Sequence, residues 1–185
     1  MYMSLLVYPT VVGAFLSGNF EFNAHLYKFS KSDLDILYKW ASTSEFQLKK
    51  APTTVGYTNK DIYICGLKYI RKNVNIRKSM MTDTVYNIMK NDEILYAVYS
   101  RFAGGTILTP HKDPDVYSDR YKRVQIPLNV TKDFYMIWNR EKIYWENGVV
   151  QVFEVMDNIH QAFNQSDKTM EFLFLDVKVN TFIDI

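Results

Sequence analysis

The stretch that decides the fold is SRFAGGTILTPHKDPDVYSDRYKRVQ, residues 100–125 of this 185-residue chain. It contains the end of one apolar run, a turn with two glycines, and a second apolar run, Thr106–Thr109, that stops just before His111 and Asp113. A third run begins at Arg123. Short apolar segments separated by turn residues are typical of antiparallel sheets, so this stretch predicts consecutive strands joined by tight turns.

The same pattern continues on both sides of this stretch. It predicts strands over the ranges Ile94–Phe102, Thr106–Thr109, Arg123–Val130, Phe134–Trp138, Val149–Val155 and Met170–Val179. Strands of this length at this spacing favour a sandwich or jelly roll. The expected fold class is therefore mainly β with supporting helices, arranged as a cupin-like double-stranded β-helix.

The first half of the chain has a mixed pattern. A helix is expected over residues 32–41, with Ser32 as its N-cap. The apolar segment 61–70 predicts a strand, and Thr82 or Asp83 could cap a second helix. Both helices are expected to pack on one sheet of the jelly roll.

A chain of 185 residues is long enough for one well-buried domain, and it contains no internal repeat and no low-complexity linker. We therefore expect a single domain over residues 1–185. Within it, residues 1–92 should form a mixed helix and strand support, and residues 93–180 the double-stranded β-helix core.

Composition narrows the class of protein. The net charge of +2 is too small to indicate a nucleic-acid partner. Cys65 is the one cysteine, so no internal disulfide can form and a reducing compartment is expected. The apolar segment 1–18 lacks a basic flank, contains Pro9 and is too short to span a bilayer, so it predicts a buried strand and turn. A cytoplasmic protein without a membrane partner is expected; its oligomeric state is left open.

Three residues could bind a metal ion. Side chains two apart on a strand share a face, so His111 and Asp113 could bind one ion from a single strand end, flanked by Pro110 and Pro114. His160, between two predicted strands, could be the third ligand. Two imidazoles and one carboxylate are the ligands of a mononuclear non-haem iron(II) site. Zinc or manganese would suit the same ligands, and a solvated turn with a surface histidine is the alternative.

Several short motifs occur in a specific order in the second half. They are Ser100-x4-Gly105-Thr106-x3-Pro110-His111, Arg123-x-Gln125-x-Pro127-Leu128, Trp145-x2-Gly148, His160-x3-Asn164-x-Ser166 and Phe174-Leu175-Asp176. Over about residues 96–178 they resemble the core of the aspartyl/asparaginyl β-hydroxylase family; the first half resembles no known family. The resemblance implies a dioxygenase that depends on iron(II) and 2-oxoglutarate and hydroxylates an amino acid or peptidyl side chain.

The resemblance also implies roles for the candidate metal ligands. His111 and His160 match the two iron-binding imidazoles of the family. The founding hydroxylases have glycine where this chain has Asp113, so the resemblance here implies the complete two-histidine, one-carboxylate ligand set. Asn164 and Gln125 are candidates for orienting the histidines, although either could be a strand-end polar residue.

The cosubstrate residues match less completely. Ser100 and Arg123 match positions that contact the cosubstrate in the family, and Gln125 stands where the family often has a histidine. Met170 stands where the family usually has an arginine that binds the far carboxylate of 2-oxoglutarate. The basic side chains that could replace it are Lys168, expected on the same strand face as Met170, Arg123 and Arg101.

Two other functions stay open at this point. One is a non-catalytic jelly-roll protein with a binding or structural role, which the methionine at position 170 favours. The other is a cupin-type metal enzyme with a different cosubstrate. The substrate could be a free amino acid, a protein side chain or a small metabolite.

Overall fold

The computed structural model describes residues 31–51, 62–70, 74–113, 121–156 and 158–178. The strand and turn predicted over residues 1–18, and Pro114 beside the predicted ligands, lie outside this part of the chain.

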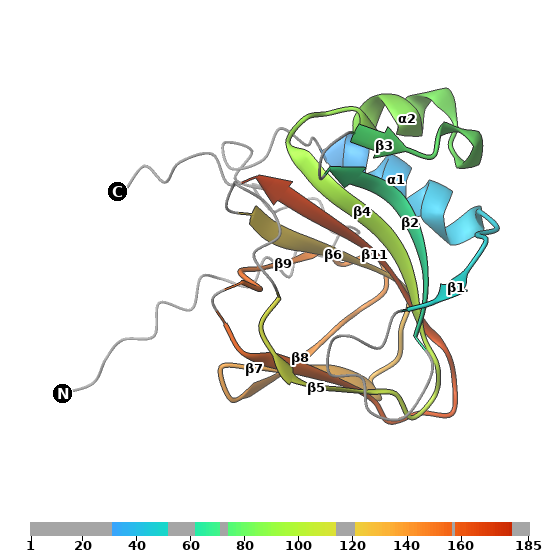
Figure 1. The fold of residues 1–185 in the computed structure, drawn as a ribbon. Coiled ribbons are helices and arrows are strands. Elements are labelled where there is room, and N and C mark those ends of the chain that lie inside the picture. The colour runs from blue at the N-terminus through green and yellow to red at the C-terminus, as the bar shows by residue number, and fades with distance from the viewer. Residues whose placement is uncertain (1–30, 52–61, 71–73, 114–120, 157, 179–185) are drawn as a thin grey trace.

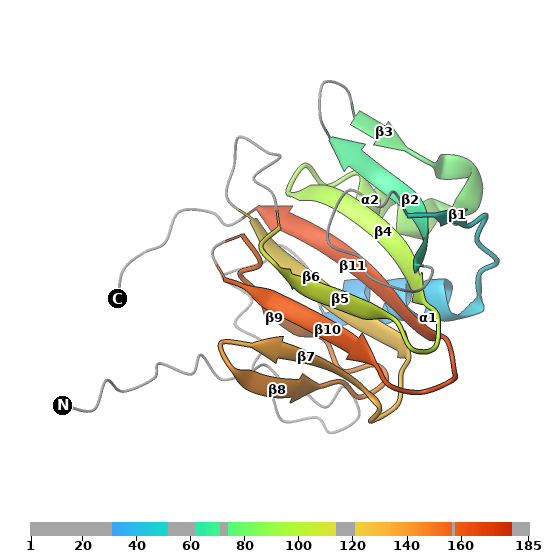
Figure 2. The ribbon, with the colours of Figure 1, turned by 60° about the horizontal axis from the view of Figure 1, so that its bottom comes forward.

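Two antiparallel sheets face each other and form the body of the molecule (Figure 1). The larger sheet has the order β1-β2-β4-β11-β6-β9, with β3 beside β2. Its strands are β1 (Lys49–Lys50), β2 (Ile62–Ile70), β3 (Val74–Ile76), β4 (Ile94–Phe102), β6 (Tyr121–Asn129), β9 (Gln151–Phe153) and β11 (Met170–Lys178). The smaller sheet, nearer the viewer in Figure 2, contains β5 (Ile107–His111), β10 (His160–Asn164), β7 (Phe134–Trp138) and β8 (Glu141–Tyr144), in that spatial order.

From β4 onward the chain passes repeatedly from one sheet to the other. It visits the larger sheet in β4, β6, β9 and β11, and the smaller sheet in β5, β7, β8 and β10. This is the path of a double-stranded β-helix, so the predicted fold class is confirmed. The first half of the chain also contributes to the larger sheet, because β2 pairs with β4.

Two helices cover the outer face of the larger sheet, as predicted (Figure 1). In α1 (Lys31–Thr43), Leu34 and Leu37 are buried. The helix already includes Lys31, so Ser32 lies inside it and the prediction of Ser32 as its N-cap is wrong. In α2 (Asp83–Met89), the predicted cap is present, because the hydroxyl of Thr82 accepts a hydrogen bond from the backbone N–H of Val85. A short 3₁₀ helix, η1 (Lys78–Met80), precedes α2.

The two faces of the larger sheet bury different side chains. Val124 and Ile126 of β6 pack in the hydrophobic cluster under the helices. Because side chains alternate along a strand, Arg123 and Gln125 face the space between the two sheets. That space holds a second cluster rich in aromatic rings, including Phe102, Phe134, Phe172, Trp145 and Phe153. Charged residues on this inner face therefore require partners.

The β4–β5 and β10–β11 turns lie against each other at one end of the barrel. The backbone N–H of Gly105, which has a φ of 72°, donates to the carbonyl of Ser166. A Cβ atom on Gly104 would lie 2.5 Å from the backbone carbonyl carbon of Asp167. The close approach of the two turns therefore requires glycine at position 104.

Asn164 fixes the same two turns through its side chain. Its amide nitrogen Nδ2 donates to the carbonyls of Phe102 and Ala103 at 3.1 Å and of Lys168 at 2.8 Å. Its Oδ1 accepts hydrogen bonds from Ser166. The family motif residues at this end of the barrel thus have a structural role.

Two short strands of the smaller sheet were not predicted. The segment β10 has the sequence HQAFN, whose few apolar residues do not alternate clearly, and β8 (EKIY) is mostly exposed at an edge. The predicted strand 106–109 continues to His111 through Pro110. Proline is compatible with this strand because β5 lies at an edge of its sheet.

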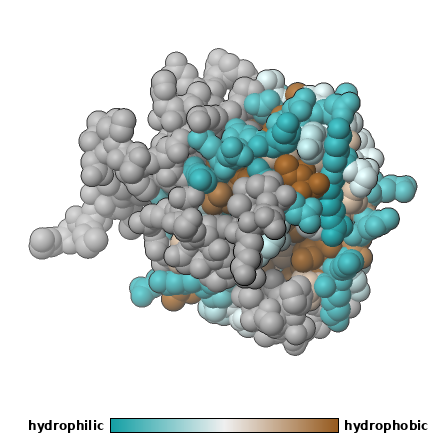
Figure 3. All heavy atoms as spheres, turned by 45° about the horizontal axis from the view of Figure 1, so that its top comes forward, coloured by the Kyte–Doolittle hydropathy of each residue, from teal (hydrophilic) through white to brown (hydrophobic). Residues whose placement is uncertain are grey.

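The surface is mixed in polarity. On the face shown in Figure 3, hydrophilic residues form most of the coloured area and hydrophobic residues appear as smaller patches. None of the helices in the described part of the chain is long and apolar enough to cross a membrane.

Candidate metal centre

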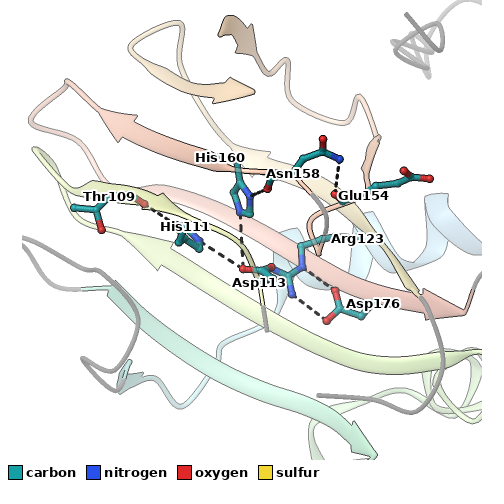
Figure 4. A network of polar contacts seen from close by, with 8 residues as sticks. All are labelled: Thr109, His111, Asp113, Arg123, Glu154, Asn158, His160 and Asp176. Carbon is teal, nitrogen blue, oxygen red and sulfur yellow. Dashed lines mark hydrogen bonds and ion pairs between the residues drawn. The ribbon is translucent and has the colours of Figure 1, made fainter. Parts of the chain in front are cut away.

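Neighbouring strands of the smaller sheet bring the predicted ligands together. His111 at the end of β5 is the cross-strand partner of His160 at the start of β10, and their ring centroids are 4.4 Å apart. Asp113 follows β5 by two residues, and its backbone N–H donates to the carbonyl of Val155. The three side chains converge at one end of the barrel, opposite the turn that contains Gly104 (Figure 4).

The ligand atoms are close to the spacing that a metal ion requires. The Oδ1 atom of Asp113 lies 3.5 Å from Nε2 of His111 and 3.8 Å from Nε2 of His160. All three candidate ligand atoms lie within 4.8 Å of one another. Metal–ligand bonds of roughly 2.1 Å place neighbouring ligands about 3 Å apart at right angles, so a small inward movement would complete the site.

Backbone carbonyls set the orientation of both imidazoles. Nδ1 of His111 contacts the carbonyl oxygen of Thr109 at 2.6 Å, and Nδ1 of His160 contacts that of Asn158 at 3.1 Å. A carbonyl only accepts, so Nδ1 carries the proton in each ring and Nε2 keeps its lone pair for a metal ion. The Asn158 side chain in turn donates to the carbonyl of Glu154 and holds the loop before β10 (Figure 4).

Asp113 is held from its other side by an arginine. Nη1 of Arg123, on β6 of the facing sheet, donates to Oδ2 of Asp113. Arg123 also donates through Nε and Nη2 to the two carboxylate oxygens of Asp176 on β11, at 2.7 and 2.9 Å. The result is a continuous chain of contacts from Asp176 through Arg123 and Asp113 to the histidines (Figure 4).

Electrostatics favour the protonation states that metal binding needs at Asp113 and His160, whereas the raised pKa of His111 means that metal binding there would displace a proton. Burial alone would raise the pKa of Asp113, but the positive charge of Arg123 outweighs it, with a smaller effect from His111, and lowers this pKa to about 2. Burial lowers the pKa of His160. Asp113 is therefore ionised and His160 neutral at pH 7, as metal ligands must be.

The pKa values of His111 and Arg123 respond to the same contacts. Burial acts to lower the pKa of His111, but hydrogen bonds to Asp113 and to the Thr109 carbonyl outweigh it and raise this pKa. Burial likewise opposes the charge on Arg123, yet Asp176 and Asp113 hold the pKa of the guanidinium well above its ordinary value. Arg123 therefore stays charged.

The predicted cosubstrate residues are only partly near this centre. Ser100 and Gln125 are buried, and the register places both on the inner face, with Ser100 opposite Phe172 and Gln125 opposite Phe174. Lys168 is exposed in the turn before β11. The prediction that Lys168 shares a strand face with Met170 is wrong, because the strand begins only at position 170.

Arg101, another predicted partner for the far carboxylate of 2-oxoglutarate, also lies away from the candidate metal centre. Arg101 contacts Glu171 at 2.7 Å and the hydroxyl of Tyr99, which packs on the helix side of the sheet. Met170 is fully buried in the aromatic cluster between the sheets. Asn164 lies at the far end of β10 from His160 and fixes the turns, so the suggestion that it orients a histidine is also wrong.

Asp176 and Trp138 lie in the centre, and no role was predicted for either. Asp176 is 2% exposed and interrupts an apolar strand, and this was the available signal, because a buried carboxylate needs a charged partner. Trp138 pairs with His160 across β7 and β10, with ring centroids 5.7 Å apart. Nothing in the local sequence around Trp138 indicates this proximity.

The donor set fits a mononuclear iron site. Two imidazole nitrogens and one carboxylate oxygen, offered from one side, match the facial triad of non-haem iron(II) oxygenases. A jelly roll that carries this triad between its sheets defines the class of cupin-fold oxygenases.

Comparison with known proteins identifies the family within this class. The family model "Aspartyl/Asparaginyl beta-hydroxylase" matches residues 36–179, well over half of the chain, and the protein belongs to this family. The match begins in α1, so it extends into the first half, for which the sequence motifs indicated no family. No curated protein sequence matches the chain.

A solved structure with a TM-score above 0.5 supports the fold at low sequence identity. An oxidoreductase of the 2OG-Fe(II) oxygenase family from Burkholderia pseudomallei superimposes with a TM-score of 0.55 at 13% identity, covering 81% of this chain and 80% of the other. A predicted oxalate decarboxylase from Thermotoga maritima gives a TM-score of 0.48 at 11% identity, covering 73% and 95%.

Proposed function

We propose that this protein is an iron(II)- and 2-oxoglutarate-dependent dioxygenase that hydroxylates an amino acid or a peptidyl side chain. The observation that carries the proposal is the convergence of His111, Asp113 and His160, with both Nε2 atoms and one carboxylate oxygen directed to one point. Membership of the hydroxylase family supports the type of reaction.

The protein's own groups have separate tasks in this reaction. His111, Asp113 and His160 would hold iron(II), which with the keto acid supplies the activation of oxygen. The carbonyls of Thr109 and Asn158 keep the two rings in the metal-binding orientation. The aromatic residues between the sheets exclude water from the inner side of the centre.

Three residues on the inner face are proposed to bind the keto acid. Arg123 has five N–H groups, and three of them make the contacts with Asp113 and Asp176, so two remain for a carboxylate beside the metal. Ser100 and Gln125 lie on the same face and are proposed to contact the rest of the molecule. This assignment follows the match of the three positions to the family motifs.

A second candidate is a cupin-type metal enzyme with a different cosubstrate. It is favoured by Met170, which is fully buried among aromatic rings where the family's arginine would be. Burial of a second carboxylate without a cation to pair with it would be costly.

One titration separates these functions. The protein is titrated anaerobically with iron(II) and then with 2-oxoglutarate, and a weak visible charge-transfer band is expected, followed by succinate when air is admitted. Iron binding without the band would favour the second candidate. If iron and keto acid leave the melting temperature unchanged and no succinate forms, a non-catalytic jelly-roll protein is the better description. The variant His160→Ala is the control and should give neither band nor succinate.

We also propose a cytoplasmic location and a small-molecule or peptidyl partner. The single cysteine, Cys65, is buried and unpaired, which suits a reducing compartment. Fractionation of cells that express the protein would test the location, and recovery in the membrane fraction would contradict it.

A further inference from the structure

The strongest unexplained feature is the three-residue chain that ends on one oxygen of Asp113. Its two carboxylates and one guanidinium are joined by three hydrogen bonds, although each group would be costly to bury alone. Asp176 and Asp113 have exposed side-chain fractions of only 2% and 9%. Stability alone does not account for such a network, because a buried ion pair often stabilises a fold no more than apolar side chains of similar size would.

The network joins two central strands of the larger sheet to the segment that follows the edge strand β5. Arg123 and Asp176 are direct cross-strand partners on β6 and β11, two central strands of the larger sheet. Asp113 lies beyond the end of β5, and its backbone N–H donates a hydrogen bond to the carbonyl of Val155, in the segment that follows β9. The side chain of Asp113 therefore takes its orientation from the facing sheet.

The contact also divides the work of the two carboxylate oxygens. Oδ2 of Asp113 accepts from Arg123, whereas Oδ1 faces Nε2 of His111 and of His160. A metal ion bound by the histidines would meet Oδ1 alone. A carboxylate released from Arg123 could instead chelate the ion with both oxygens and occupy a position that substrates need.

Asp176 determines how much of the positive charge of Arg123 acts on Asp113. With Asp176 bound through two hydrogen bonds, the guanidinium is already neutralised from one side. Without Asp176, Asp113 would be the one remaining anion among these three residues, and Arg123 would compete with the metal for it. The pair thus orients Asp113 without withdrawing its negative charge.

We propose that Arg123, held by Asp176, is the positioning residue that makes Asp113 a one-oxygen metal ligand. This inference rests on the proposed metal centre and goes beyond it. It assigns to Arg123 a role toward the metal ligand in addition to any contact with a keto acid.

The test measures metal binding rather than turnover. Cobalt(II) is titrated into the metal-free full-length protein, with affinity measured by calorimetry and coordination followed by visible absorption. Arg123→Met is expected to raise the Kd about 10–100-fold, as loss of an outer partner of a metal ligand usually does, and to change the cobalt spectrum. Arg101→Met is the matched control, because Arg101 makes a comparable 2.7 Å ion pair with Glu171 away from the site, and its Kd should stay at the wild-type value.

A double-mutant cycle separates positioning from general damage. In the background of Asp113→Ala, Arg123→Met should change the Kd by no more than about twofold, because the ligand it positions is gone. Equal effects of Arg123→Met with and without Asp113 would overturn the inference. If Arg123→Met does not fold, the neutral pair Arg123→Met/Asp176→Asn replaces it, with the same expected rise in Kd.

The inference and the proposed function fail in different ways. If the wild-type protein binds no cobalt(II) or iron(II), the metal centre itself is wrong. If it binds metal and Arg123→Met binds with unchanged Kd and spectrum, the positioning role alone is wrong. Rescue of the cobalt spectrum by Arg123→Lys would support a role for the positive charge at this position.

Discussion

The two ends of the barrel share strands β10 and β11 but are built by opposite means. At the metal end, β5, β6, β10 and β11 contribute His111, Arg123, His160 and Asp176, and the contacts are ionic. At the other end, the neutral amide of Asn164 on β10 donates to the carbonyl of Phe102 on β4, and the side chain of Met170 on β11 is buried. One end carries the candidate metal ligands, whereas the other joins turns of the two sheets. The difference shows that β10 and β11 each carry a residue of the candidate metal end and a residue of the turn end at opposite ends of the strand.

Removing an imidazole should have the largest effect, and only at the metal end. His160→Ala is expected to raise the Kd for cobalt(II) by more than about 100-fold, because one of three ligands is lost. Calorimetry gives the Kd, and circular dichroism checks folding. Gln161→Ala, the next residue on β10, is the control and should bind metal normally. Tight binding by His160→Ala would break the assignment of this end.

A charge placed at the other end should be poorly tolerated. Met170→Arg is expected to lower the free energy of unfolding by about 4 kcal/mol, because position 170 is fully buried in the aromatic cluster. Urea denaturation measures this loss, and Met170→Leu should cost less than about 1.5 kcal/mol. Wild-type stability of Met170→Arg would show that this end does accept a cation. Tighter binding of 2-oxoglutarate by the variant would then indicate a carboxylate pocket there.

Loss of the Asn164 amide should destabilise the fold and leave metal binding intact. Asn164→Ala removes the donor to the three carbonyls of Phe102, Ala103 and Lys168, and should lower the free energy of unfolding by about 3 kcal/mol. The cobalt(II) affinity of the folded variant should stay within about twofold of wild type. A large loss of affinity would mean that the two ends are coupled.

Acid should weaken the metal end first. The pKa of Asp113 is lowered to about 2, so its contribution to stability is present above pH 4 and is lost as the pH falls toward 2. In metal-free protein this contribution should be about 2 kcal/mol. Urea denaturation between pH 5 and 2 should show it in wild type, and Asp113→Asn should lack that part of the pH dependence. An identical pH dependence in both proteins would contradict the ion pair with Arg123.

The sequence predicted the parts that depend on local pattern. The strand Ile94–Phe102 was predicted with its observed bounds, because its apolar residues are continuous and end at a glycine turn. The spacing of His111 and Asp113 predicted that both could bind one metal ion, because side chains two residues apart on an extended segment point to the same face. His160 was a weaker prediction, since β10 has too few apolar residues to show a period.

Long-range pairs were beyond such patterns. Arg123 and Asp176 are 53 residues apart, and their contact depends on β6 and β11 being neighbours in this register. A one-residue shift of either strand would turn one of the two side chains to the helix side. The turn position of Lys168 was missed for a related reason, because the bounds of a strand depend on its partners.

Gly104 and Gly66 differ in what the fold allows them to become. A Cβ on Gly66 would meet nothing within 4 Å, whereas one on Gly104 would lie 2.5 Å from the backbone of Asp167. Alanine at position 66 would therefore meet no steric clash. Position 104 can change only if the backbone around Asp167 moves with it. A change in the β4–β5 turn at position 104 would therefore require a matching change in the β10–β11 turn, although more than 60 residues separate the two turns in the sequence.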